Sequence, residues 1–209
     1  SNINTALRNV NALLRLTTNL INFERADTYS GSLYVSEYEL STYMEETIDA
    51  FRSYANIKHI NLTYESSFRY LNVWLDKDKM DSILKNIISN ALKYTPDGGN
   101  VHVFTSETED TWSIEVKDTG IGIPASEQKK LFKMHFRGSN AINSKVTGSG
   151  IGLLLVGKLV HLHKGKLNFS SMEGKGSCIK ITFPKGNKHF RKAIQRPQPK
   201  NERIVYSAS

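Results

Sequence analysis

Two spacings of apolar residues alternate along the chain between residues 40 and 183. Helical spacing predicts amphipathic helices, and alternation at every second residue predicts strands buried on one face. The predicted helices are Leu40–Ala55, a segment from Asp76 or Asp78 to Tyr94, a short segment around Gln128–Lys133, and Gly150–His161. The predicted strands are Ile60–Tyr64, Asn72–Leu75, Val101–Thr105, Trp112–Lys117, Lys166–Phe169 and Cys178–Phe183. These elements do not follow a strict strand–helix–strand order. The sequence therefore predicts an α/β two-layer sandwich, with helices on one face of a largely antiparallel sheet.

A long helix is predicted before this region, over Thr5–Ala26. Its apolar seam consists of Val10, Leu13, Thr17 and Leu20, and neighbouring leucine, isoleucine and phenylalanine residues widen it. So broad an apolar face needs a partner, which is either another helix in a bundle or the domain of the same chain. Residues Thr28–Val35 include Ser30-Gly31-Ser32 and are expected to form a loop.

Composition limits the classes of protein to consider. The 209 residues are 39% hydrophobic and 23% charged, as in ordinary globular proteins. The longest apolar run, Ile151–Val160, contains Gly157 and Lys158 and is shorter than the roughly 18 residues of a membrane helix. The single cysteine, Cys178, lies in a predicted strand, where a reduced packing residue and a cytoplasmic location are expected.

The net charge of +8 raises the question of a nucleic-acid partner. Residues 185–209 hold seven lysines and arginines against one glutamate, so six of the eight net charges lie in this tail. The body of the chain is therefore close to neutral. We interpret the tail as a solvated linker, and no nucleic-acid partner is expected.

One predicted helix carries a line of polar side chains beside its apolar stripe. Asn86, Asn90 and Lys93 stand at positions i, i+4 and i+7, so they share one face. Carboxamide oxygens suit a hard cation such as magnesium, and a lysine offers a point charge to phosphate. A solvated helix face can show the same pattern.

Two glycine-rich segments follow. Asp118-Thr119-Gly120-Ile121-Gly122-Ile123-Pro124 comes directly after a predicted strand, so its backbone can approach a flat ligand and Asp118 can accept a hydrogen bond from an amine. Thr147-Gly148-Ser149-Gly150-Ile151-Gly152-Leu153 opens a predicted helix, where exposed backbone N–H groups can bind phosphate. Ordinary turns and helix caps use the same residues.

The order and spacing of these segments resemble the successive boxes of the histidine kinases. The boxes are N-I-I-S-N-A-L-K-Y at 86–94, D-T-G-I-G-I-P at 118–124, L-F-K-M-H-F-R-G at 131–138, G-S-G-I-G-L at 148–153 and G-K-G-S at 174–177. The resemblance covers about Leu40 to Pro184. It implies the Bergerat ATP-binding sandwich, a fold shared with type II topoisomerases, the ninety-kilodalton heat-shock chaperones and mismatch-repair ATPases.

The resemblance also implies a role for each box residue. It makes Asn90 a magnesium ligand with Asn86 beside it, Lys93 a phosphate contact, Tyr94 an adenine-stacking ring and Asp118 the acceptor of the adenine amine. It implies that Gly120, Gly122 and Ile123 line the base pocket, that Thr147, Gly148, Gly150, Gly152 and Leu153 surround the phosphates, and that Ser177 holds a water. Arg137 or Lys145, in the segment between the glycine boxes, would reach the terminal phosphate. His135 stands where the family commonly has a phenylalanine, which affects how this segment docks.

The same resemblance divides the chain into three parts. Residues 1–27 resemble the second helix of a dimerisation domain, 28–184 the ATP-binding catalytic domain, and 185–209 are a basic linker or tail. The expected activity is transfer of the ATP γ-phosphoryl group to a histidine of a dimerisation domain, in a homodimer that signals to a response regulator receiver domain. None of the six histidines has the H-E-x-x-x-P context of a phosphoacceptor, so each is expected to be a surface or partly buried residue. Any membrane attachment would come from segments upstream.

Alternative functions remain at this stage. Hydrolytic relatives place a glutamate four residues before the magnesium-binding asparagine, and Asn86 occupies that position here, where it cannot take a proton from water. A kinase is therefore favoured over an ATPase. A degenerate nucleotide-binding scaffold is the non-enzymatic alternative.

Overall fold

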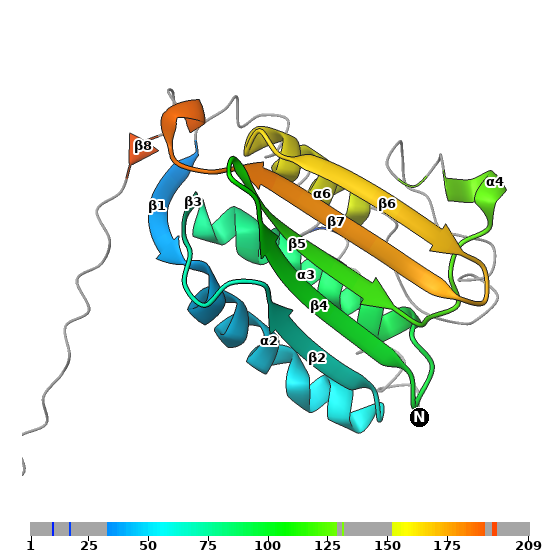
Figure 1. Cartoon of the computed structure of the whole chain (residues 1–209). Coiled ribbons are helices and arrows are strands. Elements are labelled where there is room, and N and C mark those ends of the chain that lie inside the picture. The colour runs from blue at the N-terminus through cyan, green and yellow to red at the C-terminus, as the bar shows by residue number, and fades with distance from the viewer. Residues whose placement is uncertain are drawn as a thin grey trace, which may run out of the picture.

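A computed structural model describes residues 33–128, 131, 152–190, 194 and 195, together with the single positions Val10 and Thr17. Its main body has two layers, a five-stranded sheet with α3 and α6 behind it and α2 beside α3 (Figure 1). The predicted α/β two-layer fold is confirmed. Val10 and Thr17 are helical and exposed, and the rest of the predicted helix Thr5–Ala26 lies outside the described residues.

The five-stranded sheet has the order β2-β4-β5-β7-β6. Its strands are β2 (Asn61–Ser66), β4 (Asn100–Glu107), β5 (Thr111–Asp118), β6 (Lys166–Met172) and β7 (Gly176–Pro184). Only the β2–β4 pair is parallel, and the other three pairs are antiparallel. The sheet is therefore mixed and largely antiparallel, as predicted. The carboxyl end of β5 lies next to the amino ends of β4 and β7, since Asp118 pairs with Val101 and Lys117 with Cys178.

Three helices cover the inner face of this sheet: α2 (Leu40–Ile57), α3 (Lys77–Tyr94) and α6 (Gly152–Leu162). In α3 every residue of the predicted stripe is buried, and these residues are Met80, Ile83, Leu84, Ile87, Ile88 and Ala91. They pack with the inward side chains of the strands, such as Val103, Ile114 and Ile181, into one core. Because the side chains alternate along each strand, one face of the sheet supplies this core.

Both α2 and α3 begin at an acidic cap. Glu39 accepts hydrogen bonds from the backbone N–H groups of Ser41 and Thr42, and Asp76 accepts one from Lys79. A side-chain oxygen at this position satisfies an N–H group that the helix leaves unpaired. Of the two caps predicted for α3, Asp76 is therefore the one used.

A second, smaller sheet lies beside the main one, in the order β3-β1-β8. It is formed by β1 (Tyr34–Glu39), β3 (Asn72–Leu75) and β8 (Ile194–Gln195). The expectation of a loop over Thr28–Val35 is wrong for Tyr34 and Val35, which pair in parallel with β8. The pairing partner lies about 160 residues away, so local sequence carries no signal for it.

The segment after β7 packs against this small sheet. A 3-10 helix, η1 (Lys188–Phe190), places Phe190 in a buried cluster with Leu33 and Val35. A short helix, α4 (Ala125–Gln128), precedes the helix predicted around Gln128–Lys133, and the predicted segment apart from Gln128 and Leu131 lies outside the described residues.

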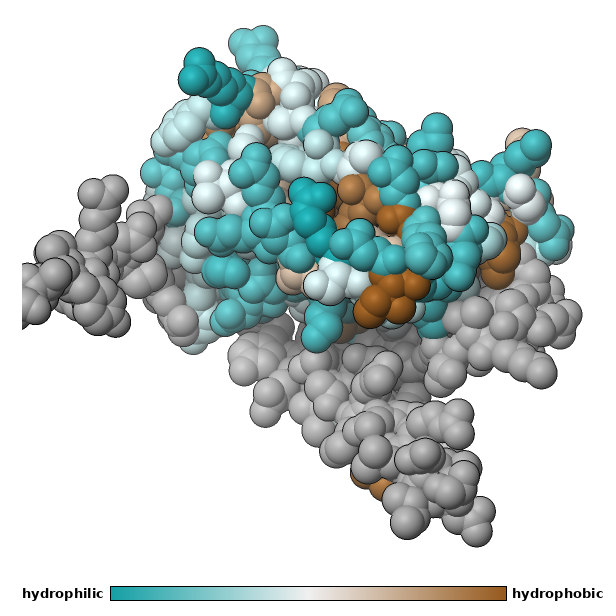
Figure 2. All heavy atoms as spheres, turned by 90° about the horizontal axis from the view of Figure 1, so that it is seen from below, coloured by the Kyte–Doolittle hydropathy of each residue, from teal (hydrophilic) through white to brown (hydrophobic). Residues whose placement is uncertain are grey.

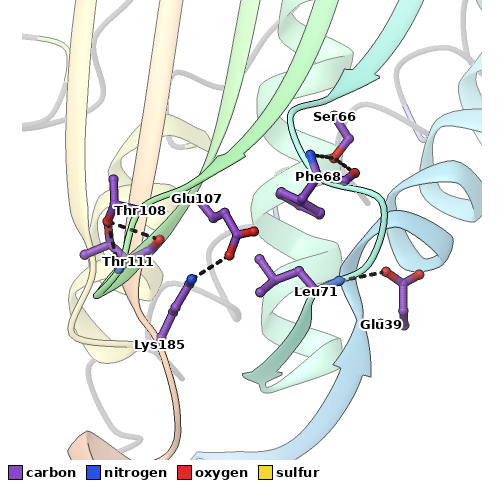
Figure 3. Close-up of polar contacts among 8 residues, drawn as sticks. All are labelled: Glu39, Ser66, Phe68, Leu71, Glu107, Thr108, Thr111 and Lys185. Atoms are coloured by element: carbon purple, nitrogen blue, oxygen red, sulfur yellow. Dashed lines mark hydrogen bonds and ion pairs between the residues drawn. The ribbon is translucent and has the colours of Figure 1, made fainter.

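Polar contacts close the loops at one end of the main sheet (Figure 3). Ser66 Oγ donates to the Phe68 carbonyl at 2.8 Å, and Leu71 N donates to Glu39 Oε1 at 3.3 Å. Lys185 forms an ion pair with Glu107 beside the β4–β5 turn. This end is opposite to the one that carries Asp118.

The molecular surface is mainly hydrophilic on the side seen from below, with apolar side chains in small groups (Figure 2). None of the helices within the described part of the chain has the length and apolar character needed to cross a membrane.

Candidate functional site

The polar line of α3 is half-buried at the edge of the helix layer. Asn86, Asn90, Lys93 and Tyr94 are all of intermediate exposure, beside the fully buried stripe. Asn86 Nδ2 donates to the Ser82 carbonyl at 2.8 Å, which turns Oδ1 away from the helix backbone. Lys93 Nζ lies 4.8 Å from the centre of the Tyr94 ring and 3.4 Å from its hydroxyl oxygen. A cation and an aromatic face are thus held together at the end of α3.

Asp118 ends β5 and organises the backbone around it. Its Oδ1 accepts hydrogen bonds from Gly120 N at 2.8 Å and Ser177 N at 3.2 Å. Among the described residues both hydrogen bonds to this carboxylate end on Oδ1, so Oδ2 can accept a ligand donor. The pKa of the Asp118 carboxyl is raised above its ordinary value by burial, and the hydrogen bonds from Gly120 N and Ser177 N offset only part of this rise. The structure thus brings the predicted residues Asp118, Gly120 and Ser177 together.

Two glycines are required where the loop after β5 passes other backbone. A Cβ on Gly120 would lie 2.6 Å from the Tyr94 carbonyl oxygen, and one on Gly122 would lie 2.0 Å from the Met172 carbonyl oxygen. Gly122 also has a φ of 62°, which favours glycine. This loop is therefore wedged between the end of α3 and the β6–β7 hairpin, and Ile121 N donates to the Tyr94 carbonyl at 3.2 Å.

The start of α6 meets the middle of α3. A Cβ on Gly152 would lie 2.5 Å from Asn86 Oδ1, so the two predicted site residues are in contact. Leu153 follows at intermediate exposure. The remaining predicted residues lie outside the described part of the chain, and these are Arg137, Lys145, Thr147, Gly148 and Gly150. His135 lies outside it as well.

The sequence interpretation missed two polar residues that hold the loop at 118–124, called the glycine loop below. Ser171 Oγ accepts from Ile123 N and donates to the Gly176 carbonyl, each at 2.9 Å. Gln128 Nε2 donates to the carbonyls of Ile123 at 2.9 Å and Ser171 at 2.8 Å. Two of these contacts, Ser171 with Ile123 N and Gln128 with the Ser171 carbonyl, join residues 48 and 43 positions apart, and neither Ser171 nor Gln128 lies in a box. Only the placement of Ser171 on a strand next to the Gly174–Ser177 segment could have indicated it.

One histidine differs from expectation. His163 is 1% exposed, rather than a surface or partly buried residue, and its Nε2 accepts from Asp76 N at 3.3 Å. Nδ1 lies 2.8 Å from the Leu159 carbonyl oxygen and donates to it. Burial lowers the pKa of this imidazole. Cys178 is a half-buried free thiol in β7, consistent with a packing residue.

The assembled groups suit a nucleotide. Asp118 offers a carboxylate oxygen to an exocyclic amine, Tyr94 offers a ring, and Asn86, Asn90 and Lys93 offer amide and ammonium groups along one helix. The fold and this arrangement define an ATP-binding domain of the Bergerat class.

Comparison with known proteins agrees. Residues 75–187 match the family described as histidine kinase-, DNA gyrase B- and HSP90-like ATPase, and the chain belongs to that family. Membership of this family implies that the chain binds ATP.

The relatives include sensor kinases much longer than this chain. It is 34% identical over 174 residues to the sensor histidine kinase WalK of Bacillus subtilis (strain 168), which covers 82% of this chain and 28% of that protein. Two solved structures share the fold. Full-length ShkA in complex with AMPPNP has a TM-score of 0.76 at 22% identity, covering 87% of this chain and 38% of that chain. Histidine kinase ThkA in complex with the response regulator protein TrrA has a TM-score of 0.64 at 21% identity, covering 85% and 49%. The chain thus spans less than half of each.

Proposed function

We propose that this chain is the ATP-binding catalytic part of a two-component sensor histidine kinase. It would transfer the γ-phosphoryl group of ATP to a histidine of a dimerisation domain. The observation that carries the proposal is Asn86, which stands four residues before Asn90 and faces the start of α6. Its carboxamide cannot take a proton from water, so bound ATP is protected from hydrolysis and remains available to an external nucleophile.

Each box residue has a proposed role, which the geometry supports where the residue is described. Asp118 Oδ2 accepts the adenine amine, with Ser177 placed to hold a bridging water, and the Tyr94 ring stacks on the base. Gly120, Gly122 and Ile123 line the base pocket, because their loop is wedged against Tyr94 and the β6–β7 hairpin. Lys93 contacts phosphate. Arg137 or Lys145 would reach the terminal phosphate, while Thr147, Gly148, Gly150, Gly152 and Leu153 would surround the phosphates.

The residues present fit a magnesium ion held with the nucleotide. The bond from Asn86 Nδ2 to Ser82 leaves Oδ1 aimed at the start of α6, and Asn90 lies one turn further along α3. Hard oxygen donors of this kind, completed by phosphate oxygens and waters, suit magnesium. When bound, magnesium neutralises phosphate charge, while Asn86, Asn90 and Lys93 orient the phosphates for in-line attack.

The proposed organisation of the protein follows the relatives. Residues 1–27 would be the second helix of a dimerisation domain, 28–184 the catalytic domain and 185–209 a linker or tail. The partners would be the phosphoacceptor histidine of a homodimer and a response regulator receiver domain, as the ThkA–TrrA complex suggests. A cytoplasmic location fits these roles.

The test uses γ-labelled ATP and magnesium. The chain alone should bind ATP but acquire no acid-labile, base-stable label, because no histidine has a phosphoacceptor context. Adding a separate dimerisation domain that bears the phosphoacceptor histidine should give label on that histidine. The Asn90→Ala variant, assayed in parallel, should transfer no label.

The other outcomes have distinct meanings. Rapid release of inorganic phosphate without transfer would indicate an ATPase, and failure to bind any adenine nucleotide would indicate a scaffold. Label on the chain itself would show that one of its own histidines is the acceptor, which contradicts the proposal.

A further inference from the structure

The carboxyl end of α2 forms a tight turn next to the carboxyl end of α3. Ile60 N donates to the Ala55 carbonyl at 2.9 Å and His59 N to the Asn56 carbonyl at 3.0 Å, while His59 adopts a φ of 52°. This is the Schellman pattern of helix endings. It makes Lys58 the C-cap residue of α2.

The Lys58 side chain leaves its own helix and caps α3. Its half-buried ammonium group donates to the carbonyls of Leu92 at 2.8 Å, Thr95 at 2.8 Å and Lys93 at 3.4 Å. The last carbonyls of a helix have no partner within the helix, and the carboxyl end of its dipole is negative. A cation from a neighbouring helix satisfies both requirements.

The remaining carbonyls of this turn are satisfied by other groups. The Ala91 carbonyl accepts from Thr95 N at 3.1 Å and Thr95 Oγ1 at 2.7 Å. The Tyr94 carbonyl accepts from Ile121 N at 3.2 Å. Lys58 therefore leaves the Tyr94 carbonyl to the glycine loop and satisfies the carbonyls on either side of it.

This turn is also the place where α3 meets the proposed base pocket. Lys93 and Tyr94 are its last two helical residues, and Gly120 approaches the Tyr94 carbonyl so closely that a Cβ would lie 2.6 Å from it. Asp118 lies two positions before Gly120 in the chain, and its Oδ1 accepts a hydrogen bond from Gly120 N. The position of the last turn of α3 thus fixes where Lys93, the Tyr94 ring and Asp118 stand relative to one another.

We propose that Lys58 is a positioning residue for nucleotide binding, acting through the end of α3. Lys58 touches no nucleotide in this scheme, and it lies outside the boxes and outside the matched residues 75–187. The proposal rests on the proposed function, because it takes ATP as the ligand. Without the ammonium group, the carbonyls of Leu92, Lys93 and Thr95 lose this donor, and the turn that carries Lys93 and Tyr94 loosens.

The decisive variant is Lys58→Met, which keeps the aliphatic stem and removes the donors. We expect ATP affinity to fall about tenfold, measured by calorimetry at a temperature where every variant is folded. Ile48→Val is the matched control, since Ile48 is buried in the same helix and loss of one methylene lowers stability without touching the end of α3. It should bind ATP like the wild type.

Amide hydrogen exchange supplies a readout that overall stability does not move. In Lys58→Met, exchange should accelerate at Thr95 N and Ile121 N, with protection in the middle of α2 unchanged. Lys58→Arg keeps the charge and several donors, so it should recover most of the affinity. Lys58→Arg also serves as the second variant should Lys58→Met fail to fold. Its ATP affinity is expected to be at least one-third of the wild-type affinity and no higher than it.

Wild-type affinity in Lys58→Met, or a loss no larger than in Ile48→Val, would overturn the proposal. Unchanged exchange at Thr95 and Ile121 would overturn it as well. Failure of the proposed function gives a different result: the wild type itself would then bind no ATP or transfer no phosphoryl group, while the exchange measurement would still decide whether Lys58 holds the end of α3.

Discussion

At the level of single residues, the contact between Asn86 and Gly152 links two helices that the chain joins only through a long intervening segment. The Asn86 carboxamide is held by Ser82 on one side, and the glycine leaves room for Oδ1 on the other. Any side chain at position 152 must push Oδ1 out of place. One methyl group added at position 152 can therefore disturb the proposed ion site without altering the core.

We predict that Gly152→Ala lowers the affinity for magnesium-ATP, because its Cβ would lie 2.5 Å from Asn86 Oδ1. A loss of about 1 to 2 kcal/mol in binding is expected, in the range for one disturbed hydrogen-bonding group. Gly157→Ala in the same helix is the control, since a Cβ there meets nothing within 4 Å. It should raise the free energy of unfolding by about 0.5 to 1 kcal/mol and leave affinity unchanged. Equal effects of the two variants on affinity would contradict the prediction.

Asp118 combines a cost in stability with a role in recognition. Its pKa is raised by burial, so the folded state disfavours the ionised carboxylate relative to the unfolded chain. That destabilisation is fully present at neutral pH and disappears as the pH falls through the raised pKa. A group that costs stability at the pH where it acts is typical of a functional site.

Asp118→Asn should therefore stabilise the protein at pH 7 and weaken ATP binding. The asparagine Oδ1 can still accept from Gly120 and Ser177, but an amide group replaces Oδ2 and opposes the adenine amine. We expect ATP binding to weaken by about 1 to 3 kcal/mol, with GTP much less affected. Thermal unfolding at pH 7 and at pH 3 should show the stabilisation only at pH 7. Equal losses for ATP and GTP would argue against this role.

At the level of elements, α2 and α6 end in the same way. Each has a residue other than glycine in the left-handed region after its C-cap, His59 with a φ of 52° and Lys164 with a φ of 59°. Gly165 N donates to the Val160 carbonyl at 2.9 Å, as Ile60 N does to Ala55. Both turns are well bonded and nevertheless strained for an L-residue.

His59→Gly and Lys164→Gly should each raise the free energy of unfolding by about 0.5 to 1 kcal/mol. Relief of the left-handed conformation exceeds the added backbone entropy of the unfolded chain. Denaturant unfolding gives the measurement. The exposed Glu46 in the middle of α2 provides the contrast, because Glu46→Gly should lower the free energy of unfolding by about 0.5 kcal/mol. Loss of stability in both turn variants would show that their side chains contribute more than the strain costs.

At the level of the whole molecule, periodic elements could be predicted and distant pairings could not. The burial pattern of α3 and the alternation in β4 and β5 depend on residues close together in the sequence. Their predicted bounds therefore agree with the structure to within about two residues. The first strand, β1, was missed because both of its partners are remote in sequence. Its residues 34 and 35 also adjoin a segment rich in glycine and serine.

In the candidate site, too, residues on regular elements could be predicted, and those held by long-range hydrogen bonds could not. Residues of the boxes at 86–94 and 118–124 lie together because regular elements carry them. Asn86 and Lys93 lie on α3, and Asp118 lies at the end of β5. The periodicity of the sequence gives no sign of the roles of Gln128, Ser171 and Lys58. Each forms a side-chain-to-backbone hydrogen bond that spans more than 30 residues. Gln128 donates to the Ser171 carbonyl, Ser171 Oγ accepts from Ile123 N, and Lys58 donates to the Leu92 carbonyl. A side-chain-to-backbone bond over such a distance leaves no periodic trace in a sequence.

The end of the domain opposite the nucleotide site is held by a buried histidine. His163 closes α6, accepts from the N–H of Asp76 at the start of α3, and packs edge-on against Phe183 and Phe190. The charged and titratable groups that face it are Asp76, Lys79 and His189. Protonation would cost the bond from Asp76 N, because Nε2 could no longer accept it.

We predict that stability falls as the pH drops below about 6.5, the ordinary pKa of histidine. Burial lowers the pKa of His163, so the unfolded chain takes up the proton at a higher pH than the folded protein does. The stability linked to this group is therefore complete above about pH 6.5 and is lost below it, by up to about 1.4 kcal/mol per pH unit for one proton. His163→Gln should be less stable at pH 7.5 but should show a flatter dependence between pH 7.5 and 5.5. An equally steep slope in His163→Gln would assign the titration to another group.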